Sequence, residues 1–407
     1  MSGRKVILVL LCLFLVSSLV FAGGGKQSGS STPGSGKKTV TFWFYMENLL
    51  QQEALKKVIE SFNNSQSEIV AVPRYVPFAD FKKQLSIGAT ASELPDVVIM
   101  DNPDSASYAA MGIFADITGK IDVSQYYDGH LGSCKLNNKL YGVPFGSNCL
   151  ALYYNKDMLT AANVKVPTTW DELRDAAKKL TTPRVKGFAF SALQNEEGTF
   201  GFLTWVWSTG TTSYQINNAQ GIKALTFISD LVKDGSMPRE AMNWTQGDTL
   251  HQFMPGNIAM MLNGPWQIPT LRKDAPNLNW DVALIPRDAV NVSGLGGENW
   301  HIINNNNVAA SLEFIKYMTS PAVLRTYINE FGYIAARKDV ATTQFQGDPI
   351  MTKFAEQVQY ALPRGPHPRW PEISDAISLA FNEVMAQTST PAQAAAKAQA
   401  TIDRIVR

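Results

Sequence analysis

Hydrophobic and polar positions along the first hundred residues predict strands and helices in turn. Segment 39–46 has the pattern of a strand, and the helix that follows has one apolar face made of Leu50, Ala54, Leu55, Val58, Ile59 and Phe62. Further strands are predicted at 69–76 and 96–100, with a second helix at 78–90 between them. This β-α-β-α-β order predicts an α/β fold with a parallel sheet and helices on both faces, because right-handed crossovers place them there.

The same alternation returns in the second half of the chain. Helices are predicted at 168–180, with Thr168 or Thr169 as the N-cap, and at 200–210 and 218–235. Strands are predicted at 187–190 and 257–266, the latter ending in a Gly264-Pro265 turn. Thr390 and Pro391 begin a C-terminal helix. A second lobe of the same class is expected.

Candidate binding residues follow from the strand ends. Ligands of open α/β sheets bind at the carboxyl ends of the strands, which here are 45–47, 76–78 and 101–102. Seven tryptophans lie in or beside turns, where either packing or ligand contact is open: Trp43, Trp205, Trp207, Trp244, Trp266, Trp300 and Trp370. Aromatic rings flanked by carboxylates and amides favour a carbohydrate, whose C–H faces stack on rings and whose hydroxyls need directed hydrogen bonds.

The N-terminus has the pattern of an export signal. Arg4 and Lys5 precede an apolar run at 6–20, and Ala22 offers a small residue for cleavage, so 1–22 is predicted to be a signal peptide. The Gly- and Ser-rich stretch 23–38 is predicted to be a flexible linker. A lipoprotein anchor is the alternative, although it requires a cysteine just after the cleavage site and Cys12 lies inside the apolar run.

Length and charge narrow the class further. A chain of 407 residues is too long for one core, so two domains are expected. Loss of 1–22 removes Arg4 and Lys5 and no acid, which changes the formal charge from +1 to −1. Lys and Arg are spread sparsely along the sequence, whereas phosphate binding requires a concentrated basic surface, which argues against nucleic acid as a partner.

Cys134 and Cys149 either form a disulfide or remain two buried thiols.

The residue patterns of common catalytic and metal sites are missing from the sequence. The four histidines, His130, His251, His301 and His367, lack metal-ligand spacing, so no metal and no cofactor are predicted. "GLGGENW" at 294–300 lacks the Lys-Ser/Thr of a phosphate-binding loop, and no Gly-x-Ser-x-Gly occurs. The adjacent acids Glu196 and Glu197 do not by themselves face each other across a glycosidic bond. The sequence therefore favours a protein that is not an enzyme.

Six segments carry a resemblance to a known family in their shared order along the chain. They are 94–118, 138–159, 167–173, 253–266, 295–302 and 322–340. The chain resembles the extracellular solute-binding proteins of ABC sugar importers, the maltose-binding-protein-like family, over nearly its whole length after the linker. The resemblance implies a periplasmic-binding-protein fold of two lobes, each a mostly parallel sheet flanked by helices, joined by three chain crossings.

The resemblance also implies where the lobes begin and end. Lobe 1 is expected at 39–146 plus 300–330, and lobe 2 at 147–299 plus 331–407. The crossings are expected at 139–159, near 296–300 and near 329–336, where glycines can absorb changes of φ and ψ during closure. A strand at 139–159 that crosses between lobes needs no catalytic residue.

The implied function is capture of a mono- or oligosaccharide between the lobes and its delivery to an ABC permease, by a monomer in the periplasm or otherwise outside the cytoplasmic membrane. Met100 and Asn148 depart from the maltose-type pattern, so the particular sugar is not carried over. Residue patterns and resemblance together predict fifteen ligand-binding residues: Tyr45, Met46, Glu47, Phe78, Asp101, Asn102, Asn148, Glu196, Glu197, Phe200, Trp244, Trp266, Gly297, Trp300 and Trp370.

Three alternative functions stay open. One is binding of glycerol 3-phosphate or a glycerophosphodiester, for which Arg337, Arg364 and Arg369 are the candidate phosphate partners. Another is a secreted glycoside hydrolase that uses Glu196 or Glu197 with Asp101 facing it. The third is an adhesive or structural surface protein without a small-molecule ligand.

Overall fold

Three parallel strands begin the first sheet, as the hydrophobic pattern predicts. β1 (Lys38–Phe44) pairs in parallel with β2 (Ile69–Tyr75) on one side and with β3 (Val97–Asp101) on the other. α1 (Leu49–Ser65) connects β1 to β2, and α2 (Phe78–Ala91) connects β2 to β3. Alternate residues of β1 enter the cores on the two faces of the sheet, with Phe42 on one face and Trp43 on the other.

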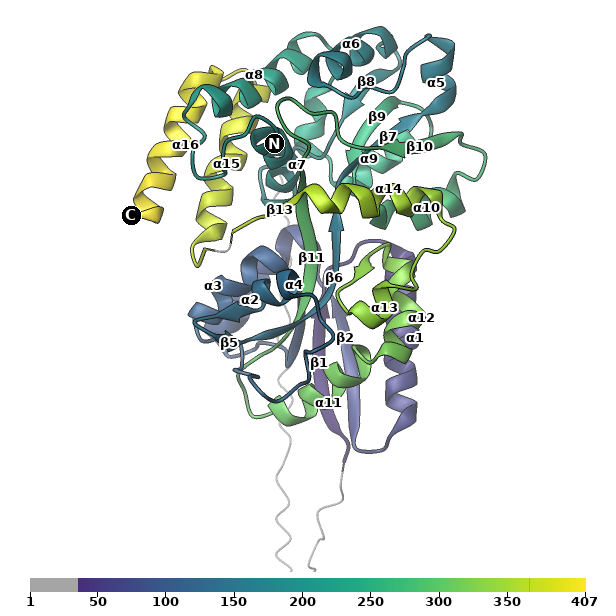
Figure 1. Cartoon of the computed structure of the whole chain (residues 1–407). Helices are drawn as coiled ribbons and strands as arrows, with labels where there is room; N and C mark the ends of the chain where they lie inside the picture. Colours follow the sequence, from purple (N-terminus) through teal and green to yellow (C-terminus); the bar gives the residue numbers. More distant parts are fainter. Residues whose placement is uncertain (1–35, 366) are drawn as a thin grey trace, which may run out of the picture. The chain divides into compact units, whose positions relative to one another are not determined.

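The computed structural model describes residues 36–365 and 367–407 (Figure 1). The predicted signal peptide, and all of the predicted linker before residue 36, lie outside the described residues. Residues Lys37–Arg407 form one unit by their contacts.

Antiparallel strands complete the first sheet, whose order is β12-β6-β11-β3-β1-β2. β11 (Ser293–Ile302) lies antiparallel between β3 and β6 (Gly142–Cys149), and β12 (Ile334–Ala335) pairs with the outer edge of β6. The short β13 (Ala361–Pro363) adds in parallel to the start of β11.

The second sheet has the order β10-β7-β9-β8 and is mostly antiparallel. Its strands are β7 (Ala151–Asn155), β8 (Lys186–Ala189), β9 (Ile258–Asn263) and β10 (Trp280–Ala283). Only β8 and β9 pair in parallel. The α/β class is as predicted, but the prediction of mostly parallel sheets is wrong, because strands that arrive from the other lobe run against their neighbours. β4 (Lys135–Leu136) and β5 (Lys139–Leu140) form a separate small hairpin.

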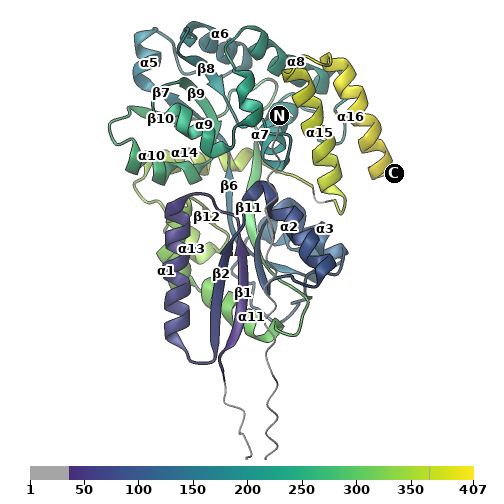
Figure 2. The same ribbon diagram turned by 180° about the vertical axis from the view of Figure 1, so that it is seen from behind.

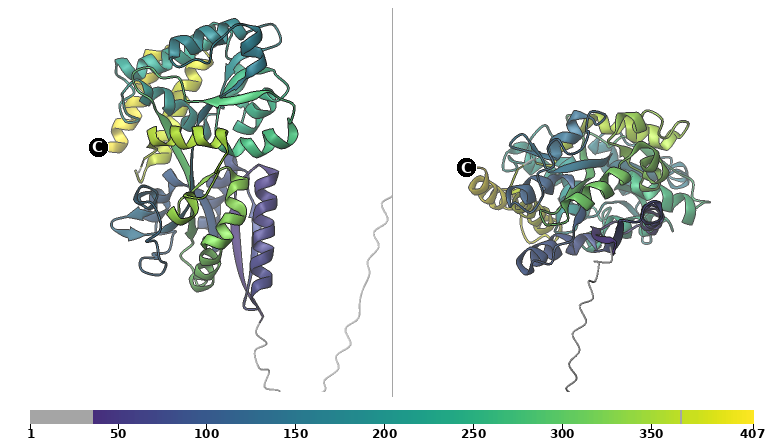
Figure 3. Two further views of the ribbon diagram at one scale, coloured as in Figure 1. Left: turned by 45° about the vertical axis from the view of Figure 1, so that its right-hand side comes forward. Right: turned by 90° about the horizontal axis from the view of Figure 1, so that it is seen from below.

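Helices cover both faces of the first sheet (Figures 2 and 3). Figure 3 shows α1, in purple, beside the green helices that follow β11, and these helices share one core cluster with β1 and β11. That face carries α1, α4 (Asp128–Ser133), α11 (Val308–Met318), α12 (Pro321–Tyr327) and α13 (Lys338–Ala341). The opposite face carries α2 and α3 (Ser105–Ala110).

The second sheet is covered in the same way. One face carries α6 (Trp170–Leu180), α7 (Glu196–Ser208), α8 (Ala219–Lys233), α15 (Trp370–Met385) and α16 (Pro391–Val406). The other carries α9 (Gln246–Phe253), α10 (Ile268–Asp274) and α14 (Pro349–Gln357), while α5 (Lys156–Ala161) follows β7. Single 3₁₀ turns are η1 (Asn102–Asp104), η2 (Arg239–Asn243), η3 (Pro265–Gln267), η4 (Ile328–Phe331) and η5 (Val358–Tyr360).

Side-chain caps fix several helix starts where the sequence predicts them. The Thr169 hydroxyl accepts a hydrogen bond from the backbone N–H of Glu172 and so begins α6. Thr390 and Gln393 form a reciprocal capping box at the start of α16.

The chain passes between the two sheets along β6 and β11. β6 belongs to the first sheet and β7, one residue later, to the second, so the predicted segment 139–159 contains this passage. β11 runs through the second predicted segment, 296–300. The third passage differs from the prediction, because Ala335, Ala336 and Val340 are buried in the core of the first sheet. Residues 331–341 therefore pack with the first lobe, and the chain leaves it only between α13 and α14.

Two further sequence questions are resolved by the fold. Cys134 and Cys149 are both buried free thiols, so the possible disulfide is not formed. Burial raises the pKa of both thiols. Across the residues that the structure describes, the helices are too short or too polar to cross a membrane.

Candidate ligand-binding site

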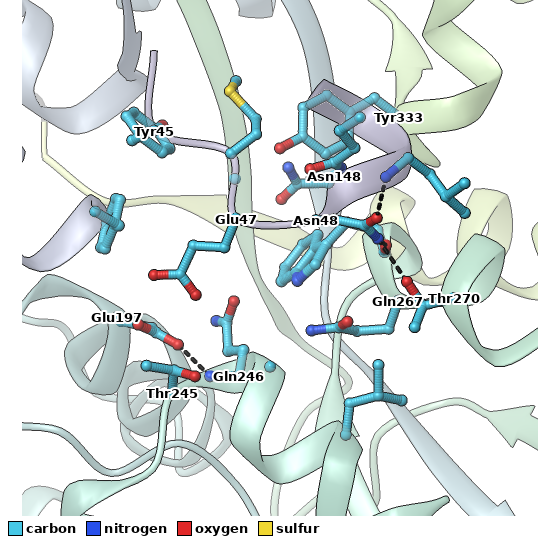
Figure 4. A pocket seen from close by; sticks show the side chains of 18 of the residues that line it. Tyr45, Glu47, Asn48, Asn148, Glu197, Thr245, Gln246, Gln267, Thr270 and Tyr333 are labelled. Atoms are coloured by element: carbon cyan, nitrogen blue, oxygen red, sulfur yellow. Dashed lines mark hydrogen bonds between the residues drawn. The ribbon is translucent and has the colours of Figure 1, made fainter. Parts of the chain in front are cut away.

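A cavity of about 430 Å³ lies between side chains of the first sheet and side chains of the second (Figure 4). Residues 45–51, between β1 and the first turn of α1, supply much of one wall. Residues 245–248 before and within α9, together with the turn after β9, supply the other. The strand ends predicted from the sequence therefore do meet at a cavity.

Ten of the fifteen predicted residues line this cavity. They are Tyr45, Met46, Glu47, Phe78, Asp101, Asn148, Glu197, Phe200, Trp266 and Gly297. Whether each of them contacts a ligand remains a prediction.

The other five predicted residues lie elsewhere. Asn102 is in the 3₁₀ turn after β3, and Trp244 is half-buried against the hydrophobic clusters of the second sheet. The Trp300 ring is fully buried, with centroids 5.2 Å from Phe42 and 6.0 Å from Phe314. β11 has a partner strand on each side and α11 over its face, so Trp300 packs in the core and the prediction that it lines the cleft is wrong.

Trp370 and Glu196 form a buried contact with each other behind the cavity wall. The indole N–H of Trp370 donates to both carboxylate oxygens of Glu196 at 3.1 Å, and Trp370 is fully buried. Glu196 also accepts a hydrogen bond from the Arg364 guanidinium at 2.7 Å. Burial tends to raise the pKa of Glu196, but the charges of Lys82 and Arg364 outweigh burial and lower it.

Arg364 lines the cavity and connects the two lobes. Its guanidinium donates two hydrogen bonds to Asp101, of 2.7 and 2.8 Å, besides the one to Glu196. It also stacks on the Phe200 ring, 4.3 Å from the centroid. Its charge is therefore already neutralised by two carboxylates before any ligand enters.

Glu298, which the sequence reasoning missed, lines the cavity and is itself buried. Its Oε1 accepts hydrogen bonds from the hydroxyls of Tyr45, at 3.2 Å, and Tyr333, at 2.9 Å. Its Oε2 is buried and has no hydrogen-bond partner. Burial, and secondarily the negative charge of Asp101, raises the pKa of Glu298 to about 8. Its position directly after Gly297 in "GGENW" was a usable signal.

A second group of carboxyls lines the cavity from opposite sides. Figure 4 shows Glu47 and Glu197 pointing toward each other across it. Burial raises the pKa of Glu197 to about 8, and Glu47 and Asp248 contribute to the rise. Partial burial and the charge of Asp248 raise the pKa of Glu47. These carboxyls can exchange hydrogen bonds with the hydroxyl groups of a ligand.

Trp266 supplies the flat apolar surface. It is half-buried, lines the cavity and stacks with Phe200 at 6.3 Å between centroids and 29° between planes. A Cβ at Gly264 would lie 1.9 Å from the Trp266 ring, so only glycine at this position leaves room for it. The absence of a side chain at Gly264 therefore leaves room for the Trp266 ring in the cavity wall.

Several lining residues carried no sequence signal. Asn48 donates to the Thr270 hydroxyl at 2.8 Å and to the Trp266 carbonyl at 3.2 Å, which joins the two lobes at the rim. Thr245, Gln246 and Asp248 lie at the start of α9, where Thr245 and Asp248 form a reciprocal capping box. The remaining lining residues not named above are Leu49, Leu50, Gln51, Gly247, Leu250, His251, Gln267, Lys273, Asp274 and Gly296. Within 36–365 and 367–407, no group of three His, Cys, Asp or Glu side chains has the geometry of a metal site.

Two α/β lobes with a polar and aromatic cavity between them define the class of two-lobed binding proteins. Residues 57–353 match the profile of bacterial extracellular solute-binding proteins. The chain belongs to this family, whose members are extracytoplasmic binding proteins rather than enzymes.

Individual relatives match most of the chain. The galactooligosaccharide-binding protein of Bacillus subtilis is 24% identical over 422 residues, which cover 98% of this chain and 96% of that protein. The multiple sugar-binding protein of Streptococcus mutans is 22% identical over 400 residues, covering 93% and 94%. An ABC transporter solute-binding protein of Thermotoga lettingae, solved with α-D-tagatose, has a TM-score of 0.85 at 26% identity, covering 91% of this chain and 100% of that one.

Proposed function

We propose that this protein is the solute-binding component of an ABC importer, which binds a mono- or oligosaccharide between its lobes and delivers it to a membrane permease. The observation that carries the proposal is the cavity itself, where the stacked rings of Trp266 and Phe200 lie opposite carboxyl and amide side chains. Sugars need both surfaces, because their C–H faces pack on rings while each hydroxyl requires a hydrogen-bond partner. Sugar-binding relatives of similar length support the same ligand class.

The phosphate alternative has less support. Of the three candidate arginines, Arg364 lines the cavity, but its guanidinium already donates hydrogen bonds to two carboxylates. Arg337 pairs with Asp339 and Arg369 with Glu372, both away from the cavity lining.

The hydrolase alternative is weakened in the form predicted from the sequence. Glu196 and Asp101 both accept hydrogen bonds from Arg364, which opposes the proton transfers that a glycosidase requires of its acid. Glu197 retains a raised pKa and faces the cavity, so a test for hydrolysis must include it.

Export, attachment and motion belong to the same proposal. We place the protein outside the cytoplasmic membrane, exported by residues 1–22 and tethered by 23–38, with lipid attachment as the open alternative. Closure would bend the chain where β6 and β11 leave the first sheet and between α13 and α14, and the binding unit is expected to be a monomer.

The test compares binding with turnover. Thermal-shift and calorimetric titrations with neutral mono-, di- and trisaccharides should show saturable binding by at least one sugar. Aryl glycosides incubated with the protein should give no product above that of heat-inactivated protein. Hydrolysis that disappears in Glu197→Gln would contradict the proposal, and so would the lack of saturable binding across the whole panel.

A further inference from the structure

Two tyrosine hydroxyls donate hydrogen bonds to one oxygen of the Glu298 carboxyl group and none to the other. Both tyrosine hydroxyls, from Tyr45 after β1 and Tyr333 before β12, donate to the same oxygen, Oε1. The other oxygen, Oε2, is buried without a partner although the residue lines the cavity. A buried polar atom without a hydrogen bond costs free energy, so native structures seldom leave one unless a ligand or water completes it.

The backbone around Glu298 brings this carboxyl close to the cavity. The register between β11 and β6 shifts between Glu298 and Asn299, where Phe145 of β6 is the extra residue of an irregular step. Gly297 has φ of 135° and its Cβ would lie 2.2 Å from the Gly146 carbonyl oxygen, so no other residue fits before Glu298.

The charges that face Glu298 determine which ligand groups could bind there. Asp101 lies on the neighbouring strand β3. Arg364 donates from its two terminal nitrogens to Asp101 and Glu196, while its buried Nε has no hydrogen-bond partner. Among the cationic side chains of the cavity lining, only Arg364 is buried, and Lys273 is exposed at the rim. Two carboxylates already balance the charge of Arg364, so an anionic ligand would find no excess positive charge there, whereas a hydroxyl group could donate to Oε2.

We propose that Oε2 of Glu298 accepts a hydrogen bond from a hydroxyl group of a neutral sugar, and that the cavity lining around Glu298 excludes acidic sugars and sugar phosphates. This assignment rests on the proposed carbohydrate-binding function and names the atom that selects neutral sugars among carbohydrates. A hydroxyl donor stabilises the ionised carboxylate, so ligand binding should release part of a proton from Glu298 near neutral pH. The neighbours Tyr45, Asp101, Tyr333 and Arg364 stay paired throughout.

Calorimetry with three variants tests this assignment. The neutral probes are D-tagatose, maltose and lactose, and the anionic probes are D-galacturonate and glycerol 3-phosphate. Each titration is run at pH 7.5 in two buffers of different ionisation enthalpy, so that proton release appears as a difference in heat. In Glu298→Gln the amide oxygen can still accept from both tyrosines, so the fold should be retained. Its affinity for the neutral sugar should fall about tenfold. The buffer-dependent heat should also fall.

Two controls separate Glu298 from other carboxyls. Glu197→Gln removes the other cavity carboxyl with a strongly raised pKa and should leave the Glu298 proton release in place. Glu313→Gln, at an exposed helical position, should change neither affinity nor heat. Melting temperatures of all three variants show whether any loss of affinity comes from unfolding.

Each result has a defined meaning. A neutral sugar that binds Glu298→Gln as tightly as the unaltered chain, with the same proton release, overturns the role of Glu298 and leaves the proposed function intact. Tighter binding of D-galacturonate or glycerol 3-phosphate than of every neutral probe overturns the exclusion of anions. If no neutral sugar of the panel binds the unaltered chain, the proposed function fails and this assignment fails with it.

Discussion

Arg364 and Asp101 form a bidentate ion pair across the two lobes, with hydrogen bonds of 2.7 and 2.8 Å between the guanidinium and the carboxylate. Asp101 ends β3 in the first sheet, and Arg364 follows β13 on the way to α15. The two side chains are only 9% and 3% exposed, respectively. Such a buried pair is costly to form but far more costly to break, because removal of one partner leaves an uncompensated charge in a dry environment.

Replacement of Arg364 should therefore destabilise the protein strongly. Arg364→Ala removes the cation that joins Asp101 to Glu196 and leaves only Lys82, 4.0 Å from Glu196, so we expect a loss of about 3–5 kcal/mol in the free energy of unfolding. Arg364→Lys keeps the charge but not the paired geometry and should give an intermediate loss. Urea unfolding of each variant measures these differences.

The matched control is Arg369, five residues further on. Its pair with Glu372 is exposed, so Arg369→Ala should leave the melting temperature nearly unchanged. Equal effects at the two positions would show that the Arg364 pair contributes no more than a surface pair.

Stability without ligand should fall as the pH rises from about 5 to 9. Burial raises the pKa of Glu197 and Glu298 from 4.5 to about 8, so the folded chain holds these protons more tightly than the unfolded chain does. Their contribution to stability is complete below pH 4.5 and is lost as the pH rises through about 8. Each carboxyl can change the free energy of unfolding by at most about 1.4 kcal/mol per pH unit.

Melting temperatures measured across this range check the direction. Glu197→Gln and Glu298→Gln should each flatten the profile and should be more stable than the unaltered chain near pH 9. A profile that keeps its slope in the double variant would mean that other groups cause it.

Local pattern was sufficient to predict much of the fold. The period of apolar positions identified β1, α1, β2, α2 and β3, and Thr169 and Thr390 marked helix starts that their caps confirm. The direction of the remaining strands could not be inferred in this way. β11 inserts between β3 and β6 from almost two hundred residues beyond β3, and nothing in its own sequence states that it runs antiparallel to both.

The residues of the candidate site could likewise be predicted only in part from the sequence. Trp266 and Trp300 both follow glycine-containing turns or segments in sequence, yet one lines the cavity and the other is buried. The difference comes from strand register, since Trp300 pairs with Ile99 and Val143 in the middle of the sheet. Tyr333 and Arg364 reach the cavity only through the path of the chain after β11, which periodicity does not reveal.

Loss of the Trp266 ring should weaken ligand binding more than it weakens the fold. The ring is half-buried and stacks on Phe200, so Trp266→Ala should lower sugar affinity about tenfold to a hundredfold, equivalent to about 1–3 kcal/mol. Trp280 is the control, because it is also half-buried and stacks on Tyr153 at 5.7 Å but does not line the cavity. Trp280→Ala should lower the melting temperature and leave the affinity of the folded protein unchanged. A large drop in melting temperature with affinity intact in Trp266→Ala would show that Trp266 is structural.

Gly264 should control binding indirectly, through the position of the Trp266 ring. Its φ of −103° suits alanine, so Gly264→Ala meets no backbone strain, but the new Cβ would lie 1.9 Å from the ring and the ring must move. The affinity should fall toward that of Trp266→Ala. In the Trp266→Ala background the same substitution should cause no further loss, because the group that it displaces is already gone. Gly132→Ala, which meets no atom within 4 Å, should leave affinity unchanged. Calorimetric titration of the four combinations measures the coupling, and losses that simply add would show that Gly264 acts on binding by a route other than the Trp266 ring.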